Sequence, residues 1–167
     1  MAILVINCGS TSVKMAVVDP KTGDRLAESK VDRLESADDA HAKAIAASLP
    51  QLVQSLDGAK VEAVGHRVVH GGNVFPQATL IDDSVEASID VLSKLAPLHN
   101  PVNLAGIQAA RRQLPDVPHV AVFDTSFHAT LPTRAKQYAI DRELAKKHSV
   151  RRFGFHGTSH QLSLIHI

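Results

Sequence analysis

A predicted strand around residues 64–69 carries the side chain best suited to bind a small charged ligand. Arg67 and Val69 are two positions apart, and because side chains alternate along a strand they share one face. Arginine binds planar carboxylates and phosphates bidentately, so this face suits a ligand with an anionic end and a methyl end. An ordinary ion pair of an edge-strand arginine is the alternative interpretation.

Asp124 and His156 are further candidates for chemistry. Asp124 directly follows the apolar run 119–123, and ligands of open α/β sheets bind at carboxyl ends of strands. A carboxylate there could hold Mg²⁺ or orient a nucleophile, or it could simply cap the next turn. His156 stands between glycines, before hydroxyl residues that can start a helix, where an imidazole can stabilise a phosphoryl group. A solvent-facing loop histidine is the alternative.

The turn Asn7–Lys14 is rich in small and hydroxyl residues and joins two apolar segments. Gly9 permits close approach of the backbone to a ligand, while Ser10, Ser12 and Lys14 can bind phosphate oxygens. The spacing is not that of a P-loop, because the second glycine is missing and a strand is expected next. A plain hairpin turn is the alternative.

Other histidine and cysteine chemistry has little support. His66 and His70 would be separated by about 13 Å along a strand, so they do not form a metal-binding pair. His70-Gly71-Gly72 resembles an oxyanion-hole sequence, yet the chain has no G-x-S-x-G nucleophile turn. The single cysteine, Cys8, excludes an internal disulfide.

Hydrophobic patterning predicts the elements that must position these residues. Strands are expected at 3–6, 13–18 and 25–31, joined by short turns and therefore antiparallel. Further strands are expected at 61–70 and 119–123, with a possible strand end at 151–153.

Capping signals and helical spacing predict the helices. One begins at the Ser36–Asp39 capping signature and ends near Pro50, and a second runs from Asp82 or Asp83 to Pro97. A third is capped by Asn100 and ends before residue 115, and a short one covers 142–147. The expected fold class is α/β, a mixed sheet with helices on both faces.

Length and composition restrict the class of protein. The 167 residues are enough for one domain, and 44% apolar with 21% charged residues is typical of a globular chain. A net charge of +1, without a block of like charges, argues against a nucleic-acid partner or a membrane surface. The early apolar run at 2–6 is too short for a signal or a membrane span, so we expect a soluble, cytoplasmic protein.

Taken together, these segments closely resemble the N-terminal domain of the acetate kinase (acetokinase) family, which belongs to the superfamily of sugar kinases, chaperones and actin. The matching segments follow the family's order: Asn7–Lys14, His66–Gly72, Pro97–Pro101, Val122–His128 and Gly154–His160. The resemblance implies a ribonuclease H-like, actin-like ATPase domain, the N-terminal half of a two-domain kinase. It also implies ATP-dependent, reversible phosphorylation of acetate to acetyl phosphate, with Mg²⁺ and direct in-line transfer.

The same resemblance implies roles for individual residues. The residues expected to be catalytic are Arg67, Asp124 and His156. The residues expected to bind the acyl group and its carboxylate are Arg67, Val69, Leu98 and Phe155. Phosphate of ATP is expected at Ser10, Ser12 and Lys14, and Mg²⁺ at Asn7.

The resemblance covers residues 1–161 and stops there. Residues 162–167 depart from the family pattern and resemble a translated adaptor from sequencing libraries, so we expect them to be a non-family tail. The family forms homodimers, and most of that dimer surface is expected to lie outside this chain. The family also continues into a second domain that holds most of the ATP site. Because one half cannot enclose both reactants, we expect the chain alone to be inactive. The alternatives are a propionate or butyrate kinase, or an inactive fragment that binds acyl phosphate.

Overall fold

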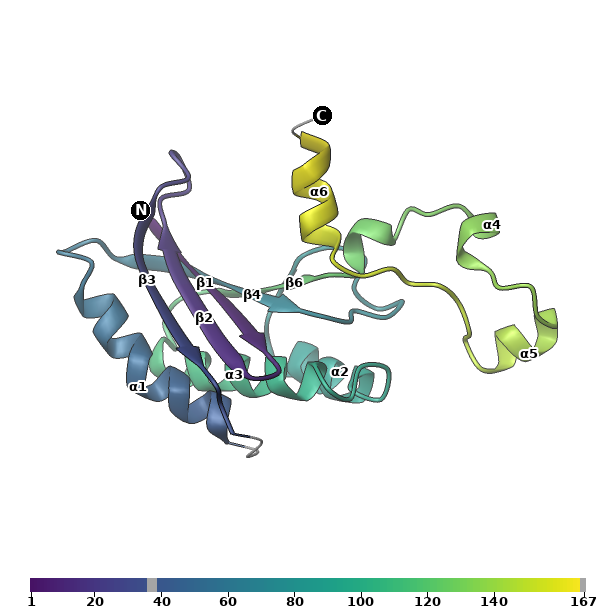
Figure 1. Cartoon of the computed structure of the whole chain (residues 1–167), viewed down its shortest axis with the longest axis horizontal. Coiled ribbons are helices and arrows are strands. Elements are labelled where there is room, and N and C mark those ends of the chain that lie inside the picture. The colour runs from purple at the N-terminus through teal and green to yellow at the C-terminus, as the bar shows by residue number, and fades with distance from the viewer. Residues whose placement is uncertain (36–38, 166–167) are drawn as a thin grey trace.

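A six-stranded mixed sheet forms the centre of the computed structural model, which describes residues 1–35 and 39–165. The Ser36 part of the predicted capping signature lies outside these residues. The strands lie in the order β3-β2-β1-β4-β6-β5 (Figure 1). Their bounds are β1 Ala2–Gly9, β2 Ser12–Val18, β3 Arg25–Asp32, β4 Val61–Val68, β5 Thr79–Leu80 and β6 His119–Phe123.

The pairing of the strands follows from the lengths of their connections. Short turns make β1, β2 and β3 antiparallel neighbours, as the sequence predicts. Crossovers through helices make β1, β4 and β6 parallel, which brings their carboxyl ends to one edge of the sheet. The two-residue edge strand β5 is not predicted, and residues 151–153 form a loop rather than a strand end.

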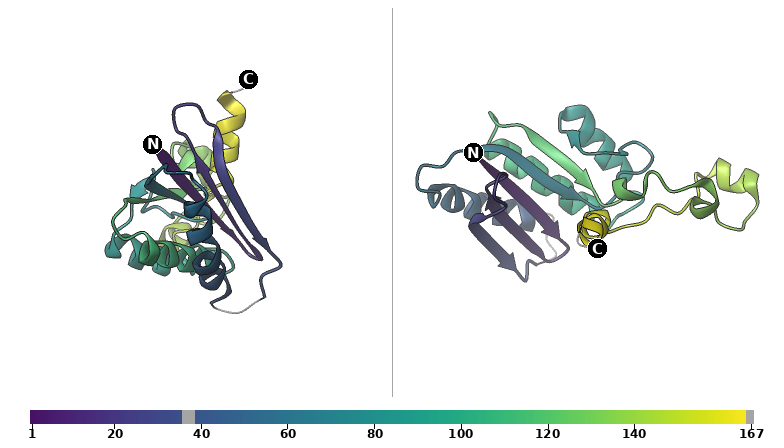
Figure 2. Two further views of the ribbon diagram at one scale, coloured as in Figure 1. Left: turned by 90° about the vertical axis from the view of Figure 1, so that its left-hand side faces the viewer. Right: turned by 90° about the horizontal axis from the view of Figure 1, so that it is seen from above.

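Three long helices pack on one face of the sheet (Figures 1 and 2). They are α1 Ala40–Gln54, α2 Asp83–Leu92 and α3 Asn100–Gln113. The shorter elements are the 3-10 turn η1 Ser126–His128, α4 Thr133–Lys136, α5 Arg142–Lys147 and α6 Gly157–Ile165.

Two predicted helix ends are wrong. Helix α1 continues through Pro50, because burial of Leu49 and Leu52 in the core outweighs the helix hydrogen bond lost at the proline. Helix α2 ends at Leu92, before tight turns in which the Ala96 amide bonds the Ser93 carbonyl. These turns carry the chain back toward the carboxyl edge of the sheet.

The fold class is confirmed, but the expected cover on both faces differs from the structure. In β1, Leu4 and Ile6 face the long helices and are buried, whereas Val5 on the opposite face is 40% exposed. On that opposite side α6 stands at one end of the sheet, and its main contacts are with η1 (Figure 1). Within residues 1–35 and 39–165, only one face is covered by long helices.

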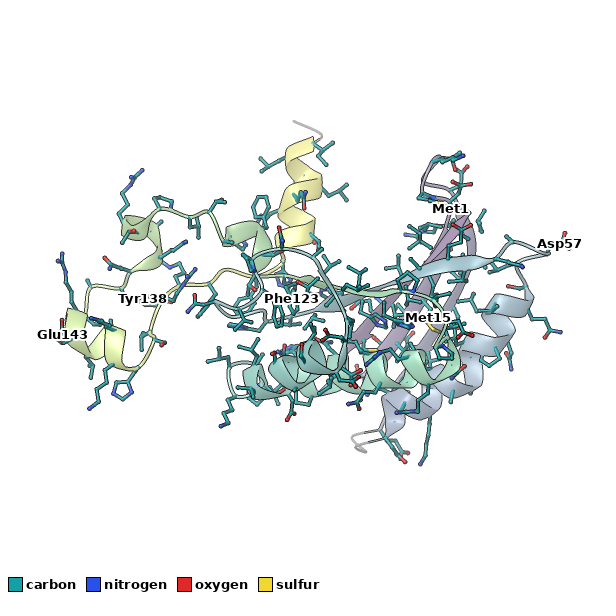
Figure 3. All side chains as sticks on the ribbon, turned by 180° about the vertical axis from the view of Figure 1, so that it is seen from behind. Met1, Met15, Asp57, Phe123, Tyr138 and Glu143 are labelled. Atoms are coloured by element: carbon teal, nitrogen blue, oxygen red, sulfur yellow. The ribbon has the colours of Figure 1, made fainter. Side chains whose placement is uncertain are left out.

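Residues 129–152 leave the body of the molecule as a projecting arm that contains α4 and α5 (Figures 1 and 2). Its side chains make few contacts with the body, as the positions of Tyr138 and Glu143 show in Figure 3. The chain returns from the arm through residues 151–156 to the carboxyl edge of the sheet. In the part of the chain that the structure describes, no helix is long and apolar enough to span a bilayer.

Candidate active site

A bidentate ion pair between Arg67 and Asp124 lies at the carboxyl ends of β4 and β6. Arg67 Nε donates to Asp124 Oδ1 at 2.9 Å, and Nη2 donates to Oδ2 at 2.7 Å. The Asp124 side chain is only 1% exposed, whereas that of Arg67 is 32% exposed. The hydrogen bonds that Arg67 donates to Asp124 raise the pKa of Arg67, which therefore carries a fixed positive charge with one accessible edge.

Asn7 and His156 complete the surroundings of the guanidinium. Arg67 Nη1 donates to Asn7 Oδ1 at 3.3 Å, and Nη2 lies 3.5 Å from His156 Nδ1. Because arginine only donates, His156 Nδ1 accepts this long hydrogen bond when the ring is neutral. The same nitrogen lies 3.8 Å from Asp124 Oδ2, so a protonated His156 can pair with that carboxylate instead.

The backbone around His156 places the imidazole beside Asp124. The Gly157 amide donates to the Asp124 carbonyl at 3.0 Å, and a Cβ at Gly157 would lie 2.4 Å from that oxygen. His156 itself has φ +55°, in the left-handed region that few non-glycine residues adopt. Strain of this kind persists only where surrounding contacts impose it, and here the hydrogen bond from Gly157 to Asp124 fixes the backbone of the loop, while the His156 side chain is 72% exposed.

A cavity of about 350 Å³ opens beside the cluster. Its polar end is formed by Arg67, Asp124 and His156, and its apolar wall includes Val69, Leu98 and Phe155. The structure thus brings together all six residues predicted for catalysis and acyl binding. Leu98 is 74% exposed and Phe155 45% exposed, so the apolar wall is open to solvent on one side.

The predicted phosphate turn is joined to this cluster by the hydrogen bond between Arg67 and Asn7. Lys14 is the cross-strand partner of Asn7, and both line a second hollow on the open face of the sheet. Across the described ranges, no hydrogen bond joins Ser10 or Ser12 to Arg67. His41, which was not predicted, bonds the Gly9 carbonyl through Nε2 at 2.7 Å and fixes the turn.

Two buried asparagines that sequence reasoning missed hold the end of β4. Asn103 Oδ1 accepts from the Val69 amide at 3.0 Å, while its Nδ2 donates to the Cys8 carbonyl at 2.9 Å. Asn100 bonds both the amide and the carbonyl of His70, each at 3.0 Å. Its predicted role as a helix cap is wrong, because His99 occupies the cap position. The sequence offered one indication of their role, because Asn100 and Asn103 are polar residues on the face of α3 that is buried.

His66 and His119 form a buried, neutral pair behind Arg67. His119 Nε2 donates to the Leu114 carbonyl at 3.0 Å, which leaves Nδ1 to accept from His66 Nε2 at 2.9 Å. Burial lowers the pKa of His66 to about 3, with a further contribution from His119, and burial also lowers the pKa of His119. The pair is a packing feature with satisfied hydrogen bonds, and it is not a metal site.

Oxygen donors near Arg67 suit a magnesium ion in part. Asn7 Oδ1 and the Asp124 carboxylate both lie against the guanidinium, and Mg²⁺ prefers oxygen ligands. Among residues 1–35 and 39–165, no three His, Cys, Asp or Glu side chains gather into a closed metal site. Mg²⁺ usually keeps several waters and uses one or two protein ligands together with substrate phosphates, so the residues present fit one side of its shell.

Comparison with known proteins identifies the family. The model of the acetokinase family matches residues 27–164. The chain belongs to the acetokinase family. It is 45% identical to acetate kinase of Streptomyces coelicolor over 181 residues, covering 95% of this chain and 44% of that protein. It is 46% identical to acetate kinase of Pseudomonas aeruginosa over 176 residues, covering 95% and 45% respectively.

Solved structures of the family have the same fold. A propionate kinase from Francisella tularensis matches with a TM-score of 0.82 and 38% identity, over 95% of this chain and 46% of that one. Acetate kinase of Porphyromonas gingivalis matches with a TM-score of 0.81 and 36% identity, over the same shares. The fold is therefore that of an actin-like ATPase domain, and this acetokinase chain spans less than half the length of each relative.

Proposed function

We propose that this chain supplies the acyl-binding half of an acetate kinase, which phosphorylates acetate reversibly with ATP by direct in-line transfer. The observation that carries the proposal is the cavity in which the Arg67 guanidinium stands beside the apolar wall of Val69, Leu98 and Phe155. One end of this cavity suits a carboxylate or acyl phosphate, and the other suits a methyl group.

In this proposal each polar residue has a positioning or electrostatic task. Arg67 binds the acetate carboxylate, and its bidentate bond to Asp124 fixes the plane of the guanidinium. Acetate is ionised near pH 7, so no general base is needed to activate it. His156 donates toward the equatorial oxygens of the phosphoryl group, whose transfer depends on alignment and charge neutralisation.

The phosphate turn and Asn7 serve the nucleotide in the same proposal. Ser10, Ser12 and Lys14 bind phosphate oxygens of ATP, and Lys14 lies on the same face of the sheet as Asn7. Asn7 and Asp124 are the residues that would hold Mg²⁺, which supplies charge neutralisation at the phosphates when bound.

We further propose that the chain alone does not turn over substrate. Phosphoryl transfer requires both reactants to be enclosed and aligned, and the relatives with this activity in their names are more than twice as long. We propose that the family pattern ends at residue 161, three residues before the end of the family-model match at residue 164. We also propose that the homodimer of the full-length family forms mainly through residues outside this chain. In α6, which crosses that boundary, Leu162, Leu164 and Ile165 are all more than half exposed.

A propionate or butyrate kinase is the second candidate, and the structural match to the propionate kinase from Francisella tularensis favours it. The space beside Val69, Leu98 and Phe155 decides between acetate, propionate and butyrate, because a longer acyl chain needs a larger pocket. A methylene group contributes only about 1–3 kcal/mol to such discrimination. An acyl-phosphate-binding fragment without any kinase role is the candidate from a different class.

Calorimetry with acetyl phosphate, combined with a coupled assay of acetyl phosphate formation, tests the proposal. We expect millimolar binding without turnover, and weaker binding of butyryl phosphate than of acetyl phosphate. Absence of binding contradicts the acyl site, and activity near that of a full-length relative contradicts the proposed inactivity. A preference for propionyl or butyryl phosphate assigns the second candidate.

A further inference from the structure

The projecting arm contains a cavity of about 630 Å³ whose wall is strongly cationic. Lys136, Arg142, Lys146 and Arg151 line it, and Glu143 is the one acidic residue among the lining residues that the structure describes. The volume lies within the range of small-molecule sites. None of its lining residues belongs to the Arg67 cavity, so the two are separate places in the fold.

The half-buried cations of this cavity are anchored only by uncharged partners. Lys136 Nζ donates to the Ala129 carbonyl at 2.6 Å, and Arg151 Nη1 donates to the Asn73 side-chain oxygen at 2.7 Å. These bonds fix the side chains without neutralising their charge. Over residues 1–35 and 39–165, none of the four cations forms an ion pair with a carboxylate.

The net charge of the whole arm also shows an excess of cations over carboxylates. Residues 129–152 contain seven Lys and Arg but only two Asp and Glu, whereas the remaining chain has eleven against fifteen. Like charges around one concave surface repel, and the repulsion is relieved when an anion binds between them. A phosphoryl group carries about two negative charges at neutral pH and accepts several hydrogen bonds, which suits this arrangement.

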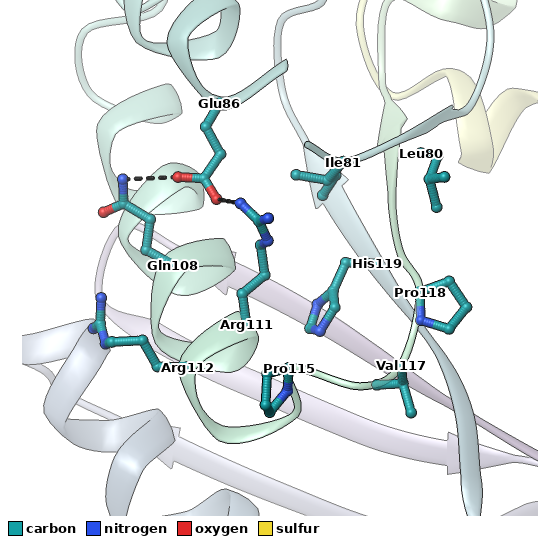
Figure 4. Close-up of a pocket in the computed structure, with 10 residues that line it drawn as sticks. All are labelled: Leu80, Ile81, Glu86, Gln108, Arg111, Arg112, Pro115, Val117, Pro118 and His119. Atoms are coloured by element: carbon teal, nitrogen blue, oxygen red, sulfur yellow. Dashed lines mark hydrogen bonds and ion pairs between the residues drawn. The ribbon is translucent and has the colours of Figure 1, made fainter. Parts of the chain in front are cut away.

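A second cavity, in the body of the molecule, contains an arginine whose charge is neutralised by carboxylates (Figure 4). There Arg111 pairs with Glu86 and with Asp83, and Gln108 Nε2 donates to Glu86 at 3.0 Å. The charge of Arg111 is thus already matched within the protein. Among the described residues that line this cavity, Arg112 alone is an arginine without a carboxylate partner, against four such cations in the arm cavity.

We propose that the arm cavity is a binding site for a phosphorylated small molecule, separate from the Arg67 cavity. The phosphate group lies between Lys136, Arg142, Lys146 and Arg151. Tyr138 and Ile140, both exposed at the same cavity, contact the organic part of the ligand. In the loop that leads back from the arm, the Arg151 guanidinium also lies 4.6 Å from the centre of the Phe153 ring.

Residue-resolved NMR of the chain, titrated with phenyl phosphate and separately with inorganic phosphate, tests the site. We expect saturable shifts of backbone amides in residues 133–151. Tighter binding of phenyl phosphate identifies an organic phosphate as the ligand class, and equal binding identifies free phosphate. Shifts confined to the Arg67 cavity, or absent from the arm, overturn the proposal whatever the outcome at Arg67.

A charge-removing variant supplies the matched comparison. Arg142→Gln with Lys146→Gln removes two exposed cations from the cavity, and we expect arm binding at least tenfold weaker. Lys60→Gln with Lys94→Gln removes the same charge from exposed positions in the body and should leave arm binding within about twofold. Equal weakening in both variants overturns the proposal, because it would show a response to net charge alone.

Discussion

The positive charge at the carboxyl edge of the sheet is paired with a carboxylate, whereas the positive charges of the arm cavity are not. Arg67 is held by a buried carboxylate through two short hydrogen bonds, so its orientation is fixed before any ligand arrives. The cations of the arm cavity are held by neutral oxygens or stand in solvent, and they keep their charge uncompensated. A preorganised guanidinium suits alignment of a reacting group, while uncompensated charge suits capture of an anion.

The largest expected effect of a substitution in this comparison is on stability at the sheet edge. Arg67→Gln leaves the buried Asp124 carboxylate without its cation, which should lower the free energy of unfolding by about 2–4 kcal/mol. Urea unfolding monitored by circular dichroism measures this change. Adding Asp124→Asn should restore much of the loss, and a double variant no more stable than Arg67→Gln would contradict the importance of the pair.

The second prediction concerns the polar side chain that ties β4 to β1. Asn103→Ala removes hydrogen bonds to the Val69 amide and the Cys8 carbonyl, both inside the fold, and should cost about 2–3 kcal/mol. Gln108→Ala on the exposed side of the same helix should cost less than about 0.5 kcal/mol. Thermal unfolding of the two variants makes the comparison, and equal losses would show that the asparagine has no special role.

The third prediction concerns acid sensitivity of the body. Because the pKa of His66 is near 3 when folded and about 6.5 when unfolded, the unfolded chain binds more protons between these values. Stability is complete above pH 6.5 and falls as the pH falls, by roughly 2 kcal/mol at about pH 5. His66→Gln should flatten this dependence, and exposed His148→Gln should not. An unchanged pH profile in the His66 variant contradicts the buried neutral pair.

The smallest expected effect on stability is in the arm. Arg142→Gln with Lys146→Gln should change the free energy of unfolding by less than about 0.5 kcal/mol, because both cations are exposed and neither pairs with a carboxylate of residues 1–35 or 39–165. A denaturation curve checks this. Destabilisation comparable to that of Arg67→Gln would mean that the arm cations also hold the fold together.

The sequence predicts the sheet edge better than the arm, for physical reasons. Alternation along a strand places Arg67 and Val69 on one face, and convergence of parallel strand ends brings Asp124 close to them. The helix-cap role predicted for Asn100 was wrong and no role was predicted for Asn103, because a buried polar residue acquires its partners only from the tertiary fold. The sequence of residues 129–152 also has no periodic pattern that predicts a projecting arm. The arm projects because its apolar side chains do not pack against the body, and this depends on the tertiary fold.

The cover on one face of the sheet was predicted incorrectly for a related reason. Ile3, Val5 and Ala16 belong to the predicted apolar strands 3–6 and 13–18, and apolar sequence alone does not say which part of a protein covers them. The predicted roles of Arg67, Asp124 and His156 remain a proposal, although the structure places these side chains within about 4 Å of one another.

NMR of the arginine Nε–H and histidine ring signals during titration with acetyl phosphate tests the central claim most directly. The account predicts that the signals of Arg67 and His156 shift together and saturate at the same concentration, while those of Arg111 stay in place. Unchanged signals from Arg67 and His156, with shifts only at the arginines of the arm, would contradict an acyl-phosphate site at the sheet edge.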